Sequence, residues 1–194
     1  MNKNFPPPPA APMNVAILRY SATAQALHWL TALLMFAVLP LGWVMTSLAQ
    51  QNPNRDALFT LHKSIGVTIL LVTIVRIAWR AANPPPALPA SLPRWEAMLA
   101  KLSHWLLYTI LLVMPVSGYI LSSAGGHPVS FFRLFELPAL PHNKGLANLG
   151  EEVHLLVQWA VYALIALHLV ATAWHVVLRR DGVLERILPV QRVE

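Results

Sequence analysis

The sequence predicts an all-α integral membrane protein, an antiparallel four-helix bundle with both termini in the cytoplasm. Hydrophobic residues make up 56% of the 194 residues and charged residues only 11%, which is far from the composition of a water-soluble domain. The mean hydropathy of +0.54 agrees with a location in the membrane. Four apolar segments account for most of the chain, and each is long enough to cross a bilayer.

Prolines and polar residues separate these segments. The segments run approximately from Ala22 to Leu48, Ala57 to Trp79, Ala97 to Ser122 and Val153 to Leu178, and they are joined by residues 50–55, 82–94 and 125–152. Residues 1–18 contain four consecutive prolines, which oppose a helix, and they lack the apolar core of a signal peptide. They are expected to form a disordered cytoplasmic tail ahead of a membrane domain at residues 19–190.

Lysines and arginines are divided unequally between the two ends of the predicted bundle. Ten lie at the end that holds the termini and four at the other end, the latter being Arg55, Lys63, Arg133 and Lys144. Because Lys and Arg are enriched on the cytoplasmic side of membrane proteins, the termini are expected there. The net charge of +6 is scattered over segment ends and forms no aromatic-interleaved patch, so lipid rather than nucleic acid is the expected partner.

Four histidines lie within the apolar segments at depths that match in pairs. His154 and His168 are fourteen residues apart, so they share one helix face about 21 Å apart at 1.5 Å per residue. His62 and His154 both follow entry from the outer side and should meet at one level. His28 and His168 lie nearer the cytoplasmic side, with a depth mismatch that helix tilt must absorb.

Two histidine pairs at two depths predict two b-type haems, each iron carrying an imidazole on both axial positions. The chain has no cysteine, which excludes thiolate-ligated clusters and covalently attached haem. The sequence therefore predicts His62 and His154 as ligands of an outer haem iron, and His28 and His168 as ligands of an inner one. Six-coordinate iron exchanges single electrons with little rearrangement and keeps no site open for oxygen.

Several further residues have two readings each. His175, seven residues beyond His168, is a rival inner ligand, but it would separate the irons by about 31 Å. Arg76 either contacts an inner-haem propionate or extends to the inner membrane surface. His104 either contacts a propionate or quinone or makes a structural hydrogen bond.

Small and hydroxyl-bearing residues near the ligands suggest how the haems are accommodated. Ala26 and Gly66 leave room for a macrocycle between helices. The second nitrogen of each ligand histidine is expected to donate a hydrogen bond that fixes the orientation of the ring, to a buried carbonyl or to a Ser/Thr hydroxyl such as that of Ser64.

The chain resembles the bacterial cytochrome b561 family over about residues 19–190. The resemblance lies in "ALHWLTALLMFAVLPLGWVM", "LHKSIGVTILLVTIVRIAWR", "LSHWLLYTILLVMPVSGYIL", "EEVHLLVQWAVYALIALHLVATAWH" and the closing "DGVLERILP". It implies a bacterial inner-membrane four-helix bundle with two b haems, and it matches His28, His62, His154 and His168 to the axial ligands of the family. His104 and His175 match recurring histidines near the haem edge or the quinone pocket.

The resemblance also implies a function. Some members are superoxide oxidases, which pass electrons from superoxide at the periplasmic face to ubiquinone, and the same activity is expected here. Lys63 would attract the superoxide anion, and His175 with His104 would relay protons to the quinone. The alternative is a cytochrome subunit that anchors a periplasmic dehydrogenase or other redox partner through residues 125–152. A bundle without haem, acting as a transporter or scaffold, is the third reading.

Overall fold

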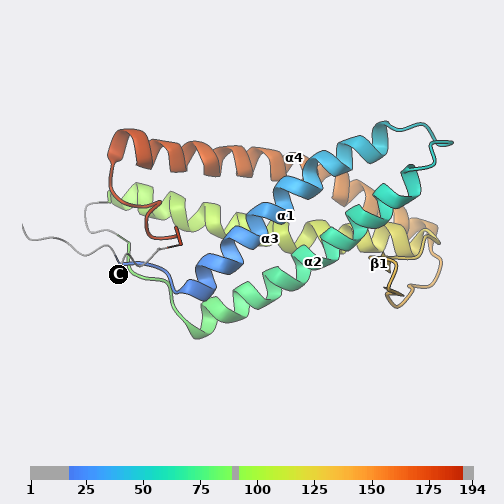
Figure 1. Cartoon of the computed structure of the whole chain (residues 1–194), viewed down its shortest axis with the longest axis horizontal. Coiled ribbons are helices and arrows are strands. Elements are labelled where there is room, and N and C mark those ends of the chain that lie inside the picture. The colour runs from blue at the N-terminus through green and yellow to red at the C-terminus, as the bar shows by residue number, and fades with distance from the viewer. Residues whose placement is uncertain (1–17, 89–91, 190–194) are drawn as a thin grey trace, which may run out of the picture.

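The computed structural model, which describes residues 18–88 and 92–189, contains the predicted bundle of four long helices (Figure 1). They are α1 (Ala22–Ser47), α2 (Arg55–Ala82), α3 (Arg94–Ala124) and α4 (Lys144–Trp174), and a five-residue π-helix, η1 (His175–Arg179), continues α4. A short antiparallel hairpin, β1 (Ser130–Phe131) and β2 (Phe135–Glu136), lies between α3 and α4. The all-α fold class is therefore confirmed. The predicted tail lies outside the described residues except for Leu18.

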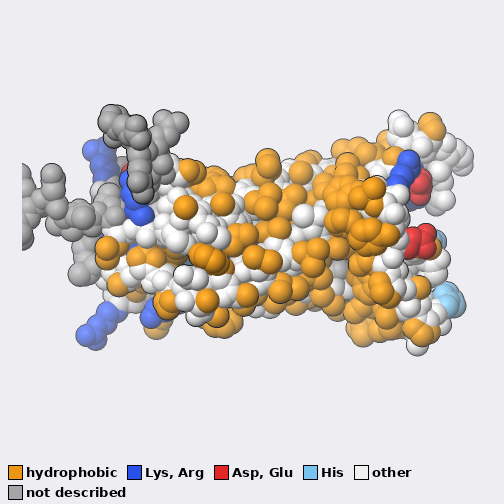
Figure 2. Space-filling view, turned by 60° about the horizontal axis from the view of Figure 1, so that its bottom comes forward, with side chains coloured by type: hydrophobic (Ala, Val, Ile, Leu, Met, Phe, Trp, Pro, Cys, Tyr) orange, Lys and Arg blue, Asp and Glu red, His pale blue; other side chains and the backbone are white. Residues whose placement is uncertain are grey.

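The surface of the bundle suits hydrocarbon rather than water. Each long helix contains an apolar stretch of membrane-spanning length, and large side chains such as Leu33 and Trp159 are 67% and 68% exposed. Figure 2 shows hydrophobic side chains covering the middle of the molecule, with Lys and Arg gathered mainly at one end. An apolar surface of this extent is stable only when lipid covers it. The chain is therefore a multi-pass membrane protein.

Helix α4 begins at Lys144, nine residues before the predicted start at Val153. The side chain of Asn143 accepts a hydrogen bond from the backbone N–H of Leu146 at 3.0 Å, which caps the helix. Gly150 packs directly on α3, since a Cβ there would lie 2.7 Å from the backbone nitrogen of Leu121. The polar residues 144–152 are thus helical because of the cap and the packing, neither of which a hydropathy pattern detects.

The helices pack in a chain, α1 on α2, α2 on α3 and α3 on α4. In the described part of the molecule, α4 does not pack directly on α1 or on α2, and Figure 1 shows α1 and α2 running obliquely to α3 and α4. Side chains alone bridge the gap, for example the indole N–H of Trp43 on α1, which donates to the hydroxyl of Tyr162 on α4. The side of α4 that faces α1 and α2 therefore has room for a bound group.

We call the end of the bundle with the start of α1 and the segment after η1 the terminal end, and the end with the hairpin the loop end. Arg186 ties the terminal end together. Its side chain is buried, and its guanidinium donates to the carbonyls of Leu18, Pro86 and Ala87 at 3.0, 2.9 and 2.7 Å. The segment after η1 is thereby fastened both to the start of α1 and to the α2–α3 connection.

Replacing Arg186 with methionine is expected to lower the free energy of unfolding by about 3 kcal/mol or more, because each hydrogen bond of a charged group contributes about 1.5–3 kcal/mol and three carbonyls would lose their donor. Thermal unfolding in detergent measures the loss. Arg19→Met, at an exposed position of the same end, is the control and should leave the midpoint unchanged. Equal midpoints for the two variants would contradict the role of Arg186.

Candidate functional site

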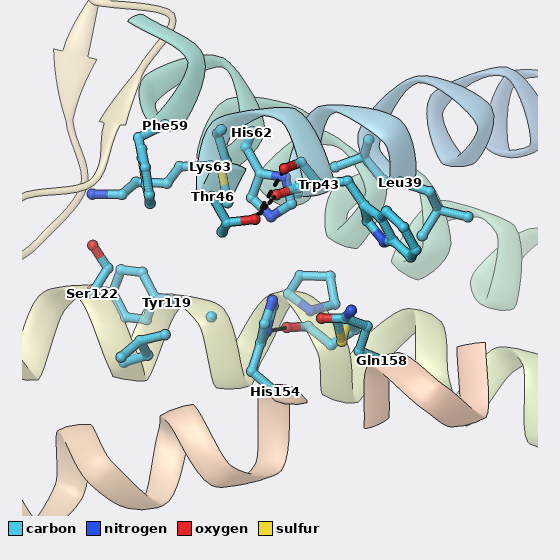
Figure 3. Close-up of a pocket in the computed structure, with 18 of the residues that line it drawn as sticks. Leu39, Trp43, Thr46, Phe59, His62, Lys63, Tyr119, Ser122, His154 and Gln158 are labelled. Carbon is cyan, nitrogen blue, oxygen red and sulfur yellow. Dashed lines mark hydrogen bonds between the residues drawn. The ribbon is translucent and has the colours of Figure 1, made fainter. Parts of the chain in front are cut away.

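His62 on α2 and His154 on α4 face each other near the loop end (Figure 3). Their ring centres are 6.4 Å apart, and the ring planes are inclined by 74°. Two imidazoles on opposite sides of one metal ion have ring centres about 6–6.5 Å apart, because each metal–nitrogen bond is about 2 Å long. The expected meeting of these histidines at one level is therefore found, at a spacing that fits one iron between them.

A cavity of about 1130 Å³ surrounds this pair and is lined by residues from all four helices. Three glycines lie along it. A Cβ at Gly118 would be 2.9 Å from His154 Cε1, and one at Gly42 would be 3.3 Å from His62 Cε1. A Cβ at Gly66 would meet no atom of the described chain within 4 Å. Because Gly118 and Gly42 have no side chain, the rings of His154 and His62 can lie along the cavity. Gly66 leaves open space beside α2 for the same reason.

His154 is held in the form that binds a metal. Its Nδ1 lies 3.0 Å from the carbonyl oxygen of Met114 and 3.2 Å from the hydroxyl of Ser117. When Nδ1–H donates to the carbonyl, Nε2 carries a free lone pair, which is the usual arrangement of a metal-bound histidine. The tautomer is thus set by α3, on which α4 packs.

The Ser64 hydroxyl, expected to serve a ligand histidine, has another role. It donates to the carbonyls of Thr60 and Ser130 at 2.7 and 3.2 Å and accepts from the backbone N–H of Phe132 at 2.8 Å. That expectation is wrong, because the side chain is fully buried against the hairpin. Ser64 fastens the hairpin to α2, two residues after His62.

His62 has a buried nitrogen that the protein leaves unsatisfied. Its Nδ1 is inaccessible to solvent and has no hydrogen-bond partner among the described residues. Almost all buried polar atoms are hydrogen-bonded, so the ring of His62, unlike that of His154, is not held by a well-formed hydrogen bond from the chain. The donor set of two imidazoles in an apolar cavity fits a b-type haem.

His28 on α1 and His168 on α4 form a second pair toward the terminal end, with ring centres 6.3 Å apart and planes inclined by 57°. The oblique course of α1 brings the two rings together, although the sequence placed them at different depths. The ring of His104 on α3 is also 6.1 Å from that of His168. Ring spacing alone therefore does not select the partner of His168.

Helix packing distinguishes the two candidate partners. Helices α3 and α4 pack directly, and directly packed helices have axes about 8–10 Å apart, too close for a macrocycle between them. Helix α1 does not pack directly on α4 in the described structure, so direct helix contact does not close the space between His28 and His168. His104 makes the structural hydrogen bond that was one of its two readings, from Nδ1 to the carbonyl of Ala100 at 2.6 Å.

Arg76 points into the bundle and not to its surface. Its Nη2 donates to Nδ1 of His28 at 2.9 Å, and its guanidinium lies 5.2 Å from the ring centre of Tyr108. Because a neutral imidazole that accepts at Nδ1 carries its proton on Nε2, iron ligation by Nε2 requires Arg76 to leave Nδ1. The freed guanidinium would then be next to whatever group His28 binds.

His175 and Lys63 lie apart from the two histidine pairs. Nδ1 of His175 donates to Oδ2 of Asp181 at 2.7 Å, and no pattern in the sequence predicts this interaction, because a π-helix and a turn separate the two residues. The ammonium of Lys63 donates to the carbonyl of Pro128 at 3.2 Å. Figure 3 shows the Lys63 side chain extending away from His62. Lys63 nevertheless lines the cavity that surrounds His62 and His154.

The fold and the two facing histidine pairs define a membrane-embedded b-type cytochrome. The family model described as prokaryotic cytochrome b561 matches residues 19–190, and the chain belongs to that family, whose members carry b-type haem and transfer electrons across membranes. The chain is 31% identical over 171 residues to cytochrome b561 homolog 2 of Escherichia coli (strain K12), covering 88% of this chain and 91% of that protein. It is 28% identical over 177 residues to probable superoxide oxidase CybB of Yersinia pestis, covering 90% and 98%.

Proposed function

We propose that this chain carries single electrons through two b-type haems, from superoxide at the loop end to ubiquinone at the terminal end. The observation that carries the proposal is the facing of two histidine pairs, with ring centres 6.4 and 6.3 Å apart. His62 and His154 would hold the outer iron, and His28 and His168 the inner one. When bound, the two haems would supply reversible one-electron chemistry, and His154 and His168, which would hold them from α4, are about 21 Å apart along the helix.

Around the inner site, the residues of the chain bind and orient the cofactor. Arg76 pairs with a propionate once it has released His28, since a buried guanidinium requires a counter-charge. His104, whose ring lies 6.1 Å from that of His168, would contact the edge of the inner haem or the quinone. His168 is favoured over His175 because its ring faces that of His28 at 6.3 Å, whereas no other histidine ring of the described residues lies against that of His175.

The donor side is proposed to face the periplasm. Most basic side chains of the described chain gather at the terminal end (Figure 2), which supports a cytoplasmic location of that end in a bacterial inner membrane. Two superoxide anions would each lose one electron at the loop end and leave as dioxygen. Support for this donor comes from the relative named probable superoxide oxidase, which aligns over 98% of its length.

The acceptor side lies at the terminal end, which ubiquinone reaches from the lipid. One ubiquinone takes two electrons and two protons to become ubiquinol, so this end needs a proton donor that water can refill. His175 is proposed for that role, because imidazole gains and loses protons near neutral pH. His104 would assist from α3.

Purified protein supplied with superoxide, with and without ubiquinone, tests this function. Superoxide is expected to reduce the haems, and ubiquinone to reoxidise them with ubiquinol as product. Haems that remain oxidised under superoxide, in protein that dithionite reduces fully, would remove superoxide as the donor.

Lys63→Glu is expected to slow superoxide-driven haem reduction about tenfold and to weaken its dependence on ionic strength, because charge in a cleft raises the local concentration of a small anion. Stopped-flow absorbance at low and high salt measures both effects, with haem content as the check on integrity. Lys144→Glu is the matched control, since Lys144 is an exposed lysine of the loop end outside the cavity. Equal rates for the two variants would remove Lys63 from the donor site.

The second candidate function is that of a cytochrome subunit which accepts electrons from a periplasmic redox protein. The observation that favours it is the hairpin connection, where Phe132, Leu134 and Phe135 are 43%, 77% and 58% exposed. Exposed apolar side chains of this kind are typical of docking surfaces. Stable association of a soluble redox protein with the purified cytochrome, together with haems that ignore superoxide, would favour this function.

A further inference from the structure

We propose that Asp181 is the positioning residue of a proton-transfer pair with His175, and that the pair delivers protons to the quinone at the terminal end. The inference rests on the proposed function in one respect, namely that ubiquinone accepts the electrons. The inference adds Asp181 to the quinone site. Asp181 is not a proposed metal ligand, and it lies outside the four long helices. The sequence marks Asp181 only as part of the closing segment.

The chain builds this pair through an unusual end to α4. The helix widens into η1, and the backbone N–H of Arg180 donates to the carbonyl of His175 at 2.7 Å. Arg180 adopts a left-handed conformation with φ of 50°, which L-residues with a side chain rarely adopt. This turn reverses the chain and returns Asp181 to the ring of His175. A backbone held in a sparsely populated conformation is typical of functional sites.

The carboxylate of Asp181 is fixed at both oxygens. Oδ2 accepts from Nδ1 of His175 at 2.7 Å, and Oδ1 accepts from the backbone N–H of Val183 at 3.3 Å. The two side chains are only 17% and 11% exposed, so water screens their attraction weakly. Asp181 therefore fixes the tautomer of His175, while Nε2 remains the nitrogen that can exchange a proton.

The proton transfer that follows is balanced. Each ubiquinone receives two electrons and two protons, and a proton passes from Nε2 of His175 to a quinone oxygen. The imidazole regains its proton from water at the terminal end before the next transfer. Asp181 keeps its charge throughout and acts only through the imidazole, as a carboxylate does when it orients a catalytic histidine.

The competing explanation is that the His175–Asp181 hydrogen bond only stabilises the fold. A neighbouring ion pair already joins this segment to the bundle, so the bond is not needed for that purpose. Arg179 pairs with Glu96 at 3.3 Å, and this contact fastens η1 to α3. The His175–Asp181 bond joins two residues of one segment and fastens no second element of the described chain. Its loss is therefore expected to leave the bundle intact.

The test compares Asp181→Asn with Glu96→Gln, a matched loss of charge at another carboxylate that is 11% exposed at the same end. Each purified holoprotein is reduced with stoichiometric dithionite and mixed in a stopped-flow instrument with decylubiquinone or with ferricyanide. Ferricyanide takes one electron and no proton. Asp181→Asn is expected to slow oxidation by the quinone at least tenfold and to leave oxidation by ferricyanide unchanged, whereas Glu96→Gln should change neither rate.

The variant His175→Gln provides a second measurement that does not depend on Asp181→Asn retaining its haem. It keeps a donor for the carboxylate but has no proton to transfer, so the same quinone-specific loss is expected. Wild-type quinone rates in both variants, or equal slowing with both acceptors, would overturn the pair and leave the proposed function standing. Reduced wild-type protein that does not react with quinone would overturn the acceptor, and the pair with it.

Discussion

A His154→Ala variant is expected to lose the outer haem and keep the inner one, so that haem per chain falls from two to one. His154 faces His62 at a ring-centre distance of 6.4 Å, and no other histidine of the described chain has its ring against that of His62. Pyridine haemochrome quantitation of the purified variant measures the change. His142→Ala, at an exposed position of the loop end, should retain both haems.

The same reasoning separates the rival partners of His168. His28→Ala is expected to lose the inner haem, and His104→Ala to retain it, because α3, which carries His104, packs directly on α4, whereas α1, which carries His28, does not in the described structure. The reverse result would assign the inner iron to His104. Retention of two haems in His154→Ala would contradict the assignment of the outer ligands.

Haem loss is also expected to loosen the bundle. A group that binds only the native state adds its binding free energy to stability. In the described structure α4 packs on α3 but not on α1 or α2. The bound haems would therefore supply many of the contacts that hold α4 to α1 and α2, and their loss would lower the free energy of unfolding.

Gly118→Ala is expected to weaken outer-haem binding about 10–100-fold, the usual effect of disturbing the groups that orient a metal ligand. A Cβ there would lie 2.9 Å from Cε1 and 3.1 Å from Nδ1 of His154, which is closer than real contacts allow. The ring must turn, and the hydrogen bond from Nδ1 to Met114 would be lost. Haem titration of the apoprotein, together with the electron paramagnetic resonance signal of the outer iron, measures the change.

The control for this substitution is Gly145→Ala, also a helical glycine near the loop end. Its Cβ would meet only Asn143 Oδ1, at 3.4 Å, which is an ordinary contact. This variant should bind haem as the wild type does. A Gly118→Ala protein with unchanged affinity and an unchanged resonance signal would mean that the ring of His154 does not need the space that Gly118 leaves.

The sequence predicts the existence of the four helices and the depth of the histidines well, for a physical reason. Spans of apolar residues fix which segments enter the membrane, and the constant rise of a helix fixes relative depth. Fourteen residues between His154 and His168 thus place two pairs at two levels. Helix tilt then brings His28 to His168, which hydropathy alone cannot show.

The features that the sequence does not predict depend on caps, helix rotation and turns. The polar start of α4 at Lys144 follows from the Asn143 cap and from packing at Gly150. A buried carbonyl is one of the expected acceptors for a ligand histidine, but that of Met114, which His154 uses, leaves no mark in a side-chain pattern that would single it out. The pairing of His175 with Asp181 requires a π-helix and a left-handed residue, which no spacing rule anticipates.

The central claim is that two histidine pairs hold two b-type haems in one chain. The dithionite-reduced minus oxidised spectrum of the purified protein, with pyridine haemochrome quantitation against protein mass, tests it most directly. Two b haems per chain with low-spin spectra are the predicted result. One haem per chain, or a high-spin spectrum that indicates an open axial position, would contradict it.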